Sequence, residues 1–189
     1  MKSLRSLLYI AAAAAVLWVV SARPWALGAE PVVVDAPRQA PEFTHGDDSD
    51  WINSAPLKLA DLEGKVVLID FWTYGCWNCQ RSIPWIKDLQ ARFGDRDLVV
   101  IGVHTPEFEY EAARTSVKEE VAKLALSSPV MIDNDFSYWN AMGNRYWPTF
   151  YLLDKSGRVR HRSIGEIRPA DMNAKTLEAY IESLLAETV

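Results

Sequence analysis

The sequence predicts a three-layer α/β protein in which helices cover both faces of a central mixed sheet. From Trp51 onward, short apolar runs alternate with segments whose apolar residues recur every three to four positions. This alternation indicates parallel strands joined by crossover helices. Near the C-terminus, two strand patterns flank the turn at 154–157, which indicates an antiparallel hairpin. The expected order is therefore β-α-β-α-β-α-β-β-α.

Hydrophobic patterning places each element in turn. The expected strands are residues 66–72, 98–103, 129–132, 149–153 and 159–164. The expected helices are centred on residues 83–93, 110–124, 136–142 and 174–184. The strand at 66–72 is apolar except for Asp70, which is typical of a strand buried on both faces. In the last strand, Arg160 and Arg162 alternate with other residues, as in an edge strand.

The N-terminal region has the features of an export signal. Lys2 and Arg5 precede an uncharged, mostly apolar stretch over residues 6–22, which Arg23 ends. We interpret residues 1–28 as either a signal peptide cleaved before Ala29 or an uncleaved membrane anchor, and a buried core helix is the alternative. Either export interpretation places the working domain outside the cytoplasm, periplasmic or tethered to the inner membrane.

The chain of 189 residues suits one domain with a short extension. Residues 29–50 are rich in Pro and Asp and are predicted to form a flexible linker with little fixed structure. The domain is expected over residues 51–189. The formal net charge of −5, without a basic stripe, argues against nucleic acid as a partner.

The two cysteines form the motif Cys76-Trp77-Asn78-Cys79. Two intervening residues allow one helical turn to bring the sulfurs within disulfide range. Cys76 then lies at a helix N-terminus, where the helix dipole and free amides stabilise a thiolate and make it nucleophilic. Cys79, one turn later, is expected to be more buried and to resolve a mixed disulfide.

Other chemistries of a Cys-x-x-Cys motif fit less well. Zinc would need about two more ligands, and the three histidines are scattered. Covalent haem attachment needs a histidine where Gln80 stands. An inert disulfide spanning one turn would constrain little of the chain. We therefore expect a redox-active disulfide, with no other cofactor and no metal.

Asp70 and Pro148 are further candidates for the site. A carboxylate at position 70 is costly to bury, so Asp70 is either a proton acceptor for Cys79, acting through water, or an outward-pointing or loop-capping residue. Pro148 opens a strand. A cis peptide there would place it against the cysteines with backbone groups free to pair with a substrate strand, whereas a trans peptide would make it a plain strand-starting proline.

Several residues beside the motif have two interpretations each. Trp77 and Trp147 either form an apolar docking surface or pack in the ordinary way. His104 and Glu107 follow a strand end, where they either border the site or cap a loop.

Residues 71–79 resemble the active-site segment of the thioredoxin superfamily, and the matching stretches 100–108, 133–140 and 146–150 point to its TlpA-like extracytoplasmic thiol-disulfide oxidoreductases. The likeness is strongest to the thioredoxin-like domain of DipZ-type cytochrome c biogenesis proteins. The resemblance implies a thioredoxin fold with a TlpA-like helical insertion at 110–124. It implies that Cys76 attacks and Cys79 resolves, that Asp70 is the buried acid and that Pro148 is the cis-proline. Thr149, in the same stretch, joins Trp77 and Trp147 among the expected substrate contacts.

Four positions depart from the family pattern. Gly75 stands where thioredoxins place tryptophan, and Trp77 lies inside the motif instead. Ser82 replaces a glutamate found in several TlpA-like proteins, and the bulky Trp147 precedes the proline. These departures bear on redox potential and substrate fit, and they leave the dithiol chemistry intact.

The resemblance implies a reductase of disulfides in extracytoplasmic partner proteins, re-reduced by a membrane thiol carrier. Cytochrome c maturation is one pathway for such a protein, because apocytochrome cysteines must be reduced before haem attachment. Two alternatives are a thiol peroxidase of the same fold and a non-catalytic metal-delivery module. The latter would need His104 or His161 as a ligand beside the cysteines.

Overall fold

The computed structural model describes residues 32–188, so the predicted signal or anchor at 1–28 lies outside the described residues. Within that span, one mixed sheet has the strand order β1-β7-β6-β3-β4-β5-β2. The strands are β1 (Val32–Gln39), β2 (Trp51–Ile52), β3 (Val66–Trp72), β4 (Leu98–His104), β5 (Val130–Ile132), β6 (Thr149–Leu153) and β7 (Arg158–Ile164). The helices are α1 (Trp77–Phe93), α2 (Arg114–Lys123), α3 (Ser137–Met142) and α4 (Met172–Ala186).

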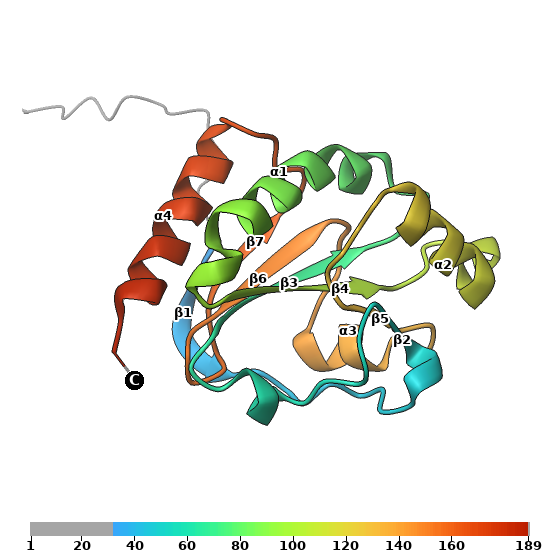
Figure 1. The fold of residues 1–189 in the computed structure, drawn as a ribbon, viewed down its shortest axis with the longest axis horizontal. Helices are drawn as coiled ribbons and strands as arrows, with labels where there is room; N and C mark the ends of the chain where they lie inside the picture. The colour runs from blue at the N-terminus through green and yellow to red at the C-terminus, as the bar shows by residue number, and fades with distance from the viewer. Residues whose placement is uncertain (1–31, 189) are drawn as a thin grey trace, which may run out of the picture.

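The sheet lies between two helical layers, with α1 and α4 on one face and α3 on the other (Figure 1). Side chains of β3 alternate between these layers, as the pleat of a strand requires. Val66 and Leu68 join the cluster that contains α1 and α4. Ile69 and Phe71 join the cluster that contains α3. The predicted three-layer architecture is therefore confirmed.

Pairing directions also follow the prediction. β3, β4 and β5 run parallel, and β6 and β7 form the expected antiparallel hairpin beside β3. Phe71 of β3 lies opposite Val103 of β4 on one side and opposite Thr149 of β6 on the other. The carboxyl end of β3 thus meets the start of β6, and α1 begins just beyond this point.

The N-terminal segment differs from the expected linker. Val32–Gln39 forms β1, which pairs antiparallel with β7, so β7 is an inner strand rather than an edge. Arg38 donates a hydrogen bond to the Met142 carbonyl at 2.7 Å, and Ala40 is buried in the core. The ordered domain therefore begins before Trp51, because backbone pairing recruits a segment whose composition alone suggested a tether.

The helix expected at 110–124 is divided. A 3-10 turn, η4 (Glu109–Ala112), precedes α2, and Ala113 between them has an extended backbone. Three further 3-10 turns are η1 (Asp48–Asp50), η2 (Leu59–Leu62) and η3 (Gly94–Arg96). Among the described helices, none combines the length and the apolar character needed to cross a membrane.

Candidate redox site

Cys76 and Cys79 form a disulfide at the N-terminus of α1, with their Cα atoms 5.2 Å apart. Cys76 is the N-cap residue, and its Sγ accepts a hydrogen bond from the Cys79 N–H at 3.2 Å. Cys76 is 9% exposed and Cys79 is 3% exposed. The outer sulfur therefore lies where the helix dipole stabilises a thiolate, and the inner sulfur is one turn deeper.

Asp70 lies buried in the middle of β3, with an exposed fraction of 7%. Its Oδ1 has no hydrogen-bond partner among the described residues, so it caps no loop through that atom. Burial raises the pKa of its carboxyl to about 8. Strand alternation places Asp70 on the same face as Leu68, the face that α1 covers. A carboxyl with this pKa exchanges protons near neutral pH on the side of the sheet that carries the cysteine helix.

The Trp147–Pro148 peptide is cis, as the family resemblance implied. Pro148 is buried directly before β6, and its carbonyl accepts a hydrogen bond from the Gly165 N–H at 2.9 Å. Among the described residues, the backbone N–H and carbonyl of Trp147 have no backbone partner. The open backbone groups thus belong to Trp147, whereas the Pro148 carbonyl is already occupied.

The three expected substrate contacts have different environments. Trp77 is 67% exposed beside the disulfide. Trp147 packs against the cysteine cluster and against Trp139, with ring centroids 4.2 Å apart, and its indole N–H donates to the Thr105 carbonyl. Thr149 is fully buried, and its hydroxyl donates to the Tyr146 carbonyl at 2.7 Å. The Thr149 hydroxyl therefore holds the loop before β6, and the expected contact of this residue with substrate stays a prediction.

His104 lies beneath the active-site turn. Tyr74 stacks on its ring with centroids 5.6 Å apart, and its Nε2 lies 3.2 Å from the Thr73 hydroxyl. Burial lowers the pKa of His104 to about 4, although the negative charge of Glu111 acts in the opposite direction. The imidazole is therefore neutral at neutral pH, and it supports the turn between β3 and α1.

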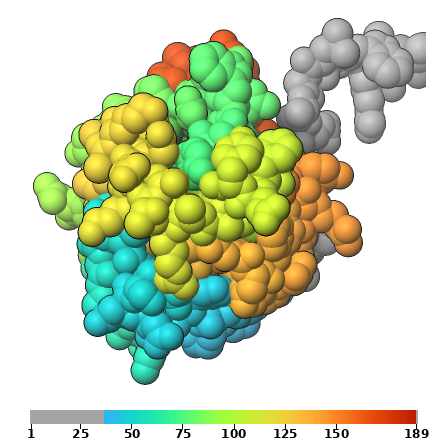
Figure 2. Space-filling model, turned by 90° about the vertical axis from the view of Figure 1, so that its right-hand side faces the viewer, coloured from blue at the N-terminus to red at the C-terminus, as the bar shows by residue number. Residues whose placement is uncertain are grey.

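Glu107 does not cap the loop through its side chain, which is exposed. The cap is Glu111, which sequence reasoning missed: its Oε2 accepts the N–H groups of Glu107 and Phe108. Its Oε1 accepts the Gly75 N–H at 3.0 Å. The hydrophobic periodicity of this stretch gave no reason to choose Glu111 over Glu109 as the residue that caps the loop. Figure 2 shows the face of the molecule that carries the connection from β4 to α2, with the yellow-green connection beside the yellow α2.

Ser82, one of the four departures from the family pattern, ties α1 to a neighbouring loop. Its hydroxyl donates to the Asn78 carbonyl at 3.2 Å and accepts the Ile167 N–H at 3.0 Å. Because Ser82 is fully buried, a longer side chain would have to displace this contact. Pro84 lies on the exposed side of α1, and the helix continues through it.

The histidines proposed for a metal-delivery role do not converge on the cysteines. His161 is buried against Tyr180 of α4, with ring centroids 4.6 Å apart. Among the described residues, the group of side chains close enough to share an ion consists of His45, Asp133 and Asp135. This group contains neither cysteine, and Asp133 already accepts the N–H groups that begin α3.

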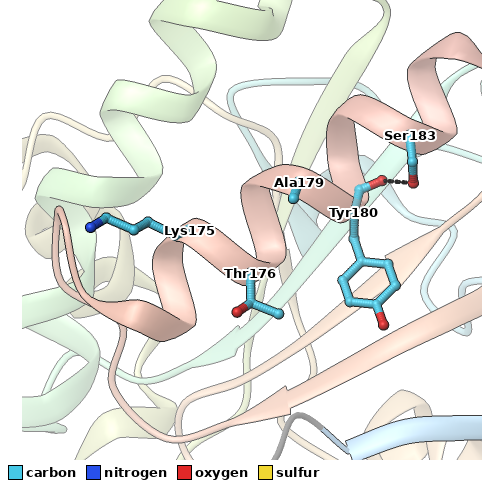
Figure 3. A pocket seen from close by; sticks show the side chains of 5 residues that line it. All are labelled: Lys175, Thr176, Ala179, Tyr180 and Ser183. Carbon is cyan, nitrogen blue, oxygen red and sulfur yellow. Dashed lines mark hydrogen bonds between the residues drawn. The ribbon is translucent and has the colours of Figure 1, made fainter.

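A hollow of about 470 Å³ lies along α4, lined by Lys175, Thr176, Ala179, Tyr180 and Ser183 (Figure 3). Its polar atoms include the Ser183 hydroxyl, which donates to the Tyr180 carbonyl at 2.8 Å. None of these residues belongs to the cysteine site. The redox chemistry is therefore located at the open end of β3 and α1, and not in this hollow.

Comparison with known proteins gives a consistent family. Residues 37–162 match the model of the AhpC/TSA family. Protein DipZ of Mycobacterium tuberculosis is 46% identical over 119 residues, covering 61% of this chain and 17% of DipZ. The thiol-disulfide oxidoreductase YkuV of Bacillus subtilis is 30% identical over 148 residues, covering 78% of this chain and 95% of YkuV.

A solved structure from Chlorobium tepidum, assigned as the thiol:disulfide interchange protein DsbE, has a TM-score of 0.68 and 27% identity. The match covers 80% of this chain and 99% of that chain. The predicted thioredoxin fold is thus confirmed. The match of residues 37–162 to the family model and the match over 95% of YkuV carry the assignment: this chain belongs to the AhpC/TSA family and is a TlpA-like member of the thioredoxin superfamily.

Proposed function

We propose that this protein is an extracytoplasmic thiol-disulfide oxidoreductase that reduces disulfides in partner proteins through Cys76 and Cys79. The observation that carries the proposal is the disulfide itself, with its outer sulfur at the N-terminus of α1 and its inner sulfur one turn deeper. The relatives YkuV and DsbE, whose names describe thiol-disulfide exchange, support the same chemistry.

The reaction consists of two sulfur transfers. The Cys76 thiolate attacks one sulfur of the partner's disulfide, which forms a mixed disulfide and releases the partner's other sulfur as a thiolate. The Cys79 thiolate then attacks the Cys76 sulfur, which re-forms the Cys76–Cys79 bond and releases the second partner sulfur. The partner gains two electrons, the enzyme loses two, and protons from solvent convert the released thiolates to thiols.

Asp70 acts in the second transfer as the proton acceptor for Cys79, through an intervening water. Its pKa of about 8 lies close to the usual pKa of a thiol, so the proton can pass in either direction near neutral pH. Its place on the α1 face of β3 supports this role. The resolving step should consequently slow in an Asp70→Asn variant.

The partner docks against the exposed Trp77 ring and pairs with the free backbone groups of Trp147, beside the buried Pro148. An extended segment around the partner's cysteine fits this combination, because main-chain pairing accepts many sequences and the aromatic ring adds apolar contact. The redox-active disulfide is the only cofactor that this mechanism uses, and no step needs a metal.

The site of action is the periplasm or the outer face of the inner membrane, given the export features of residues 1–28. A membrane thiol carrier returns electrons to the disulfide. The chain spans only 17% of DipZ, so the pathway does not follow from that relative. Cytochrome c maturation remains our proposed pathway, on the family resemblance.

A trapping experiment tests the mechanism. Cys79→Ser should accumulate a mixed disulfide between Cys76 and a partner protein, because the resolving sulfur is missing, and Cys76→Ser should accumulate none. Equal trapping by both variants, or by neither, would contradict the assigned roles. Consumption of peroxide by the native protein in the presence of a thiol reductant would instead indicate the peroxidase alternative.

The direction of electron flow is tested by the reduction potential of the Cys76–Cys79 couple, equilibrated in glutathione or dithiothreitol buffers. A value near that of thioredoxin, about −270 mV, supports a reductase. A value near that of a strong oxidant, about −120 mV, would reverse the proposed direction.

A further inference from the structure

Glu111 is a fully buried glutamate that has no basic partner within residues 32–188. It lies in η4, between the exposed Glu109 and Tyr110 on one side and the extended Ala113 on the other. Among the described residues, Glu111 forms no ion pair with a lysine, arginine or histidine. A buried carboxylate is costly unless hydrogen bonds satisfy it, so its partners indicate what it is for.

Those partners are three backbone N–H groups from two separate segments. Oε2 accepts the N–H of Glu107 at 2.6 Å and that of Phe108 at 3.0 Å. Oε1 accepts the N–H of Gly75, the residue directly before Cys76, at 3.0 Å. Glu111 therefore joins the β4–α2 connection to the turn that carries the attacking cysteine.

The absence of a side chain at Gly75 is explained by the same contact. A Cβ atom there would collide with Glu111 Oε1 and would lie 3.2 Å from Glu111 Cδ. The backbone of Gly75 is not in the left-handed region that favours glycine. A side chain at position 75 would therefore have to push the Glu111 carboxylate away from the Gly75 N–H, so glycine is the residue that keeps this contact.

The neighbouring contacts reinforce this junction. The Tyr74 hydroxyl donates to the Tyr110 carbonyl at 2.9 Å, and its ring stacks on the neutral His104. The phenol of Tyr74 has no positively charged form, and burial lowers the pKa of His104 to about 4, so neither ring offsets the carboxylate at neutral pH. In the described part of the chain, the negative charge of Glu111 is thus met by backbone N–H groups alone, and one of these belongs to Gly75, the residue before Cys76.

We propose that Glu111 is a positioning residue that holds Gly75 and Cys76 against the β4–α2 connection, and that its negative charge favours the disulfide over the Cys76 thiolate. The inference rests on the proposed function, in which Cys76 is the attacking sulfur. Like charges close together in a poorly hydrated site repel, so the reduced form is destabilised and the protein is a stronger reductant.

The relevant equilibrium is reduction by glutathione. Two glutathione thiols transfer two electrons to the Cys76–Cys79 disulfide, giving the Cys76 thiolate, the Cys79 thiol, one glutathione disulfide and one released proton. Any group that destabilises the thiolate shifts this equilibrium toward the protein disulfide, which lowers the reduction potential.

The test compares Glu111→Gln with Glu109→Gln in the full chain. Both changes remove one negative charge from η4, but only Glu111 is buried against Gly75. For Glu111→Gln, we expect the glutathione equilibrium to shift about tenfold toward the reduced form, a rise of about 30 mV. The Cys76 thiol pKa, followed by thiolate absorbance, should fall. Glu109→Gln should match the native protein in both measurements.

A folded Glu111→Gln protein with the potential and thiol pKa of the Glu109→Gln control would overturn the proposal. If Glu111→Gln does not fold, Gly75→Ala decides, because its Cβ must push the carboxylate away from the Gly75 N–H. The potential should then rise as well, and an unchanged potential in folded Gly75→Ala would refute the role. Failure of the native protein to reduce partner disulfides would contradict the proposed function alone, since these equilibria need no partner.

Discussion

At the scale of single residues, Asp70 is a carboxyl whose burial strongly disfavours its charged form. It lies in the central strand β3 with one carboxyl oxygen unpartnered, and burial raises its pKa to about 8. In the unfolded chain the same group has a pKa of about 3.9. The native protein therefore keeps a proton that the unfolded chain loses, and stability falls as pH rises from about 4 through about 8.

Asp70→Asn should remove this pH dependence, because the amide has the same shape and no charge. The gain in free energy of unfolding should be near zero at pH 4 and should grow to the order of a few kcal/mol at pH 9. Urea unfolding at both pH values measures the difference. Asp95→Asn, at an exposed carboxylate of η3, is the control and should give little gain at either pH.

Trp77 is the exposed aromatic residue between the two cysteines. Trp77→Ala should lower the rate of reduction of a protein disulfide by about tenfold, because an apolar docking contact is lost. The rate with a small disulfide should change little, since such a substrate does not reach beyond the sulfurs. Met172→Ala, at an exposed residue that begins α4, is the control. Equal losses for protein and small disulfides would indicate altered cysteine chemistry instead of docking.

At the scale of elements, one carboxylate of α4, Glu178, makes two polar contacts with α1 beside an otherwise apolar layer. The indole N–H of the fully buried Trp85 donates to Glu178 Oε1 at 3.0 Å. The other oxygen of Glu178 pairs with Arg92 at 2.9 Å. Glu178 thus satisfies a donor that the surrounding leucine and isoleucine side chains cannot, which fixes the orientation of the helix that carries the cysteines.

Glu178→Ala should lower the free energy of unfolding by about 1–3 kcal/mol, because the Trp85 N–H stays buried without an acceptor. Thermal unfolding of the oxidised protein measures this loss. Glu182→Ala, on an exposed position of the same helix, should cost less than about 0.5 kcal/mol. A loss equal to that of the control would show that solvent reaches the indole N–H.

At the scale of the whole molecule, the sheet has two edges and both are formed by segments near the N-terminus of the described chain. β1 pairs with β7 at one edge and β2 pairs with β5 at the other. β1 should contribute more to stability than β2, because it covers the seven-residue strand β7, whose backbone groups would otherwise be unpaired. Between these edges, the order of helices and strands is the one that the sequence pattern predicted.

A chain that begins at Ala40 should be less stable than one that begins at Val32, and it should aggregate. It lacks β1 and the Arg38 contact to Met142, and it exposes the unpaired edge of β7. Melting temperature and light scattering compare the two chains. Similar melting and scattering would show that β1 contributes little to the fold.

Much of the fold and the central chemistry followed from local sequence. The apolar runs set the strands from β3 to β7, and the Cys76–Cys79 spacing set the disulfide at the start of α1. These features depend on residues within one element, where periodicity and a single helical turn determine geometry. Glu111 could not be found in this way, because its role depends on a contact with Gly75 that is 36 positions away.

The sequence by itself thus determined the three-layer sheet, the redox pair and the family resemblance, because each depends on local pattern. The tertiary structure alone decided that β1 covers β7, that Thr149 is buried, and that Glu111 lies against the turn before Cys76. Each of these depends on backbone groups from distant segments that must find hydrogen-bond partners when buried. The hydrophobic pattern of a sequence does not indicate which distant group provides the hydrogen-bond partner.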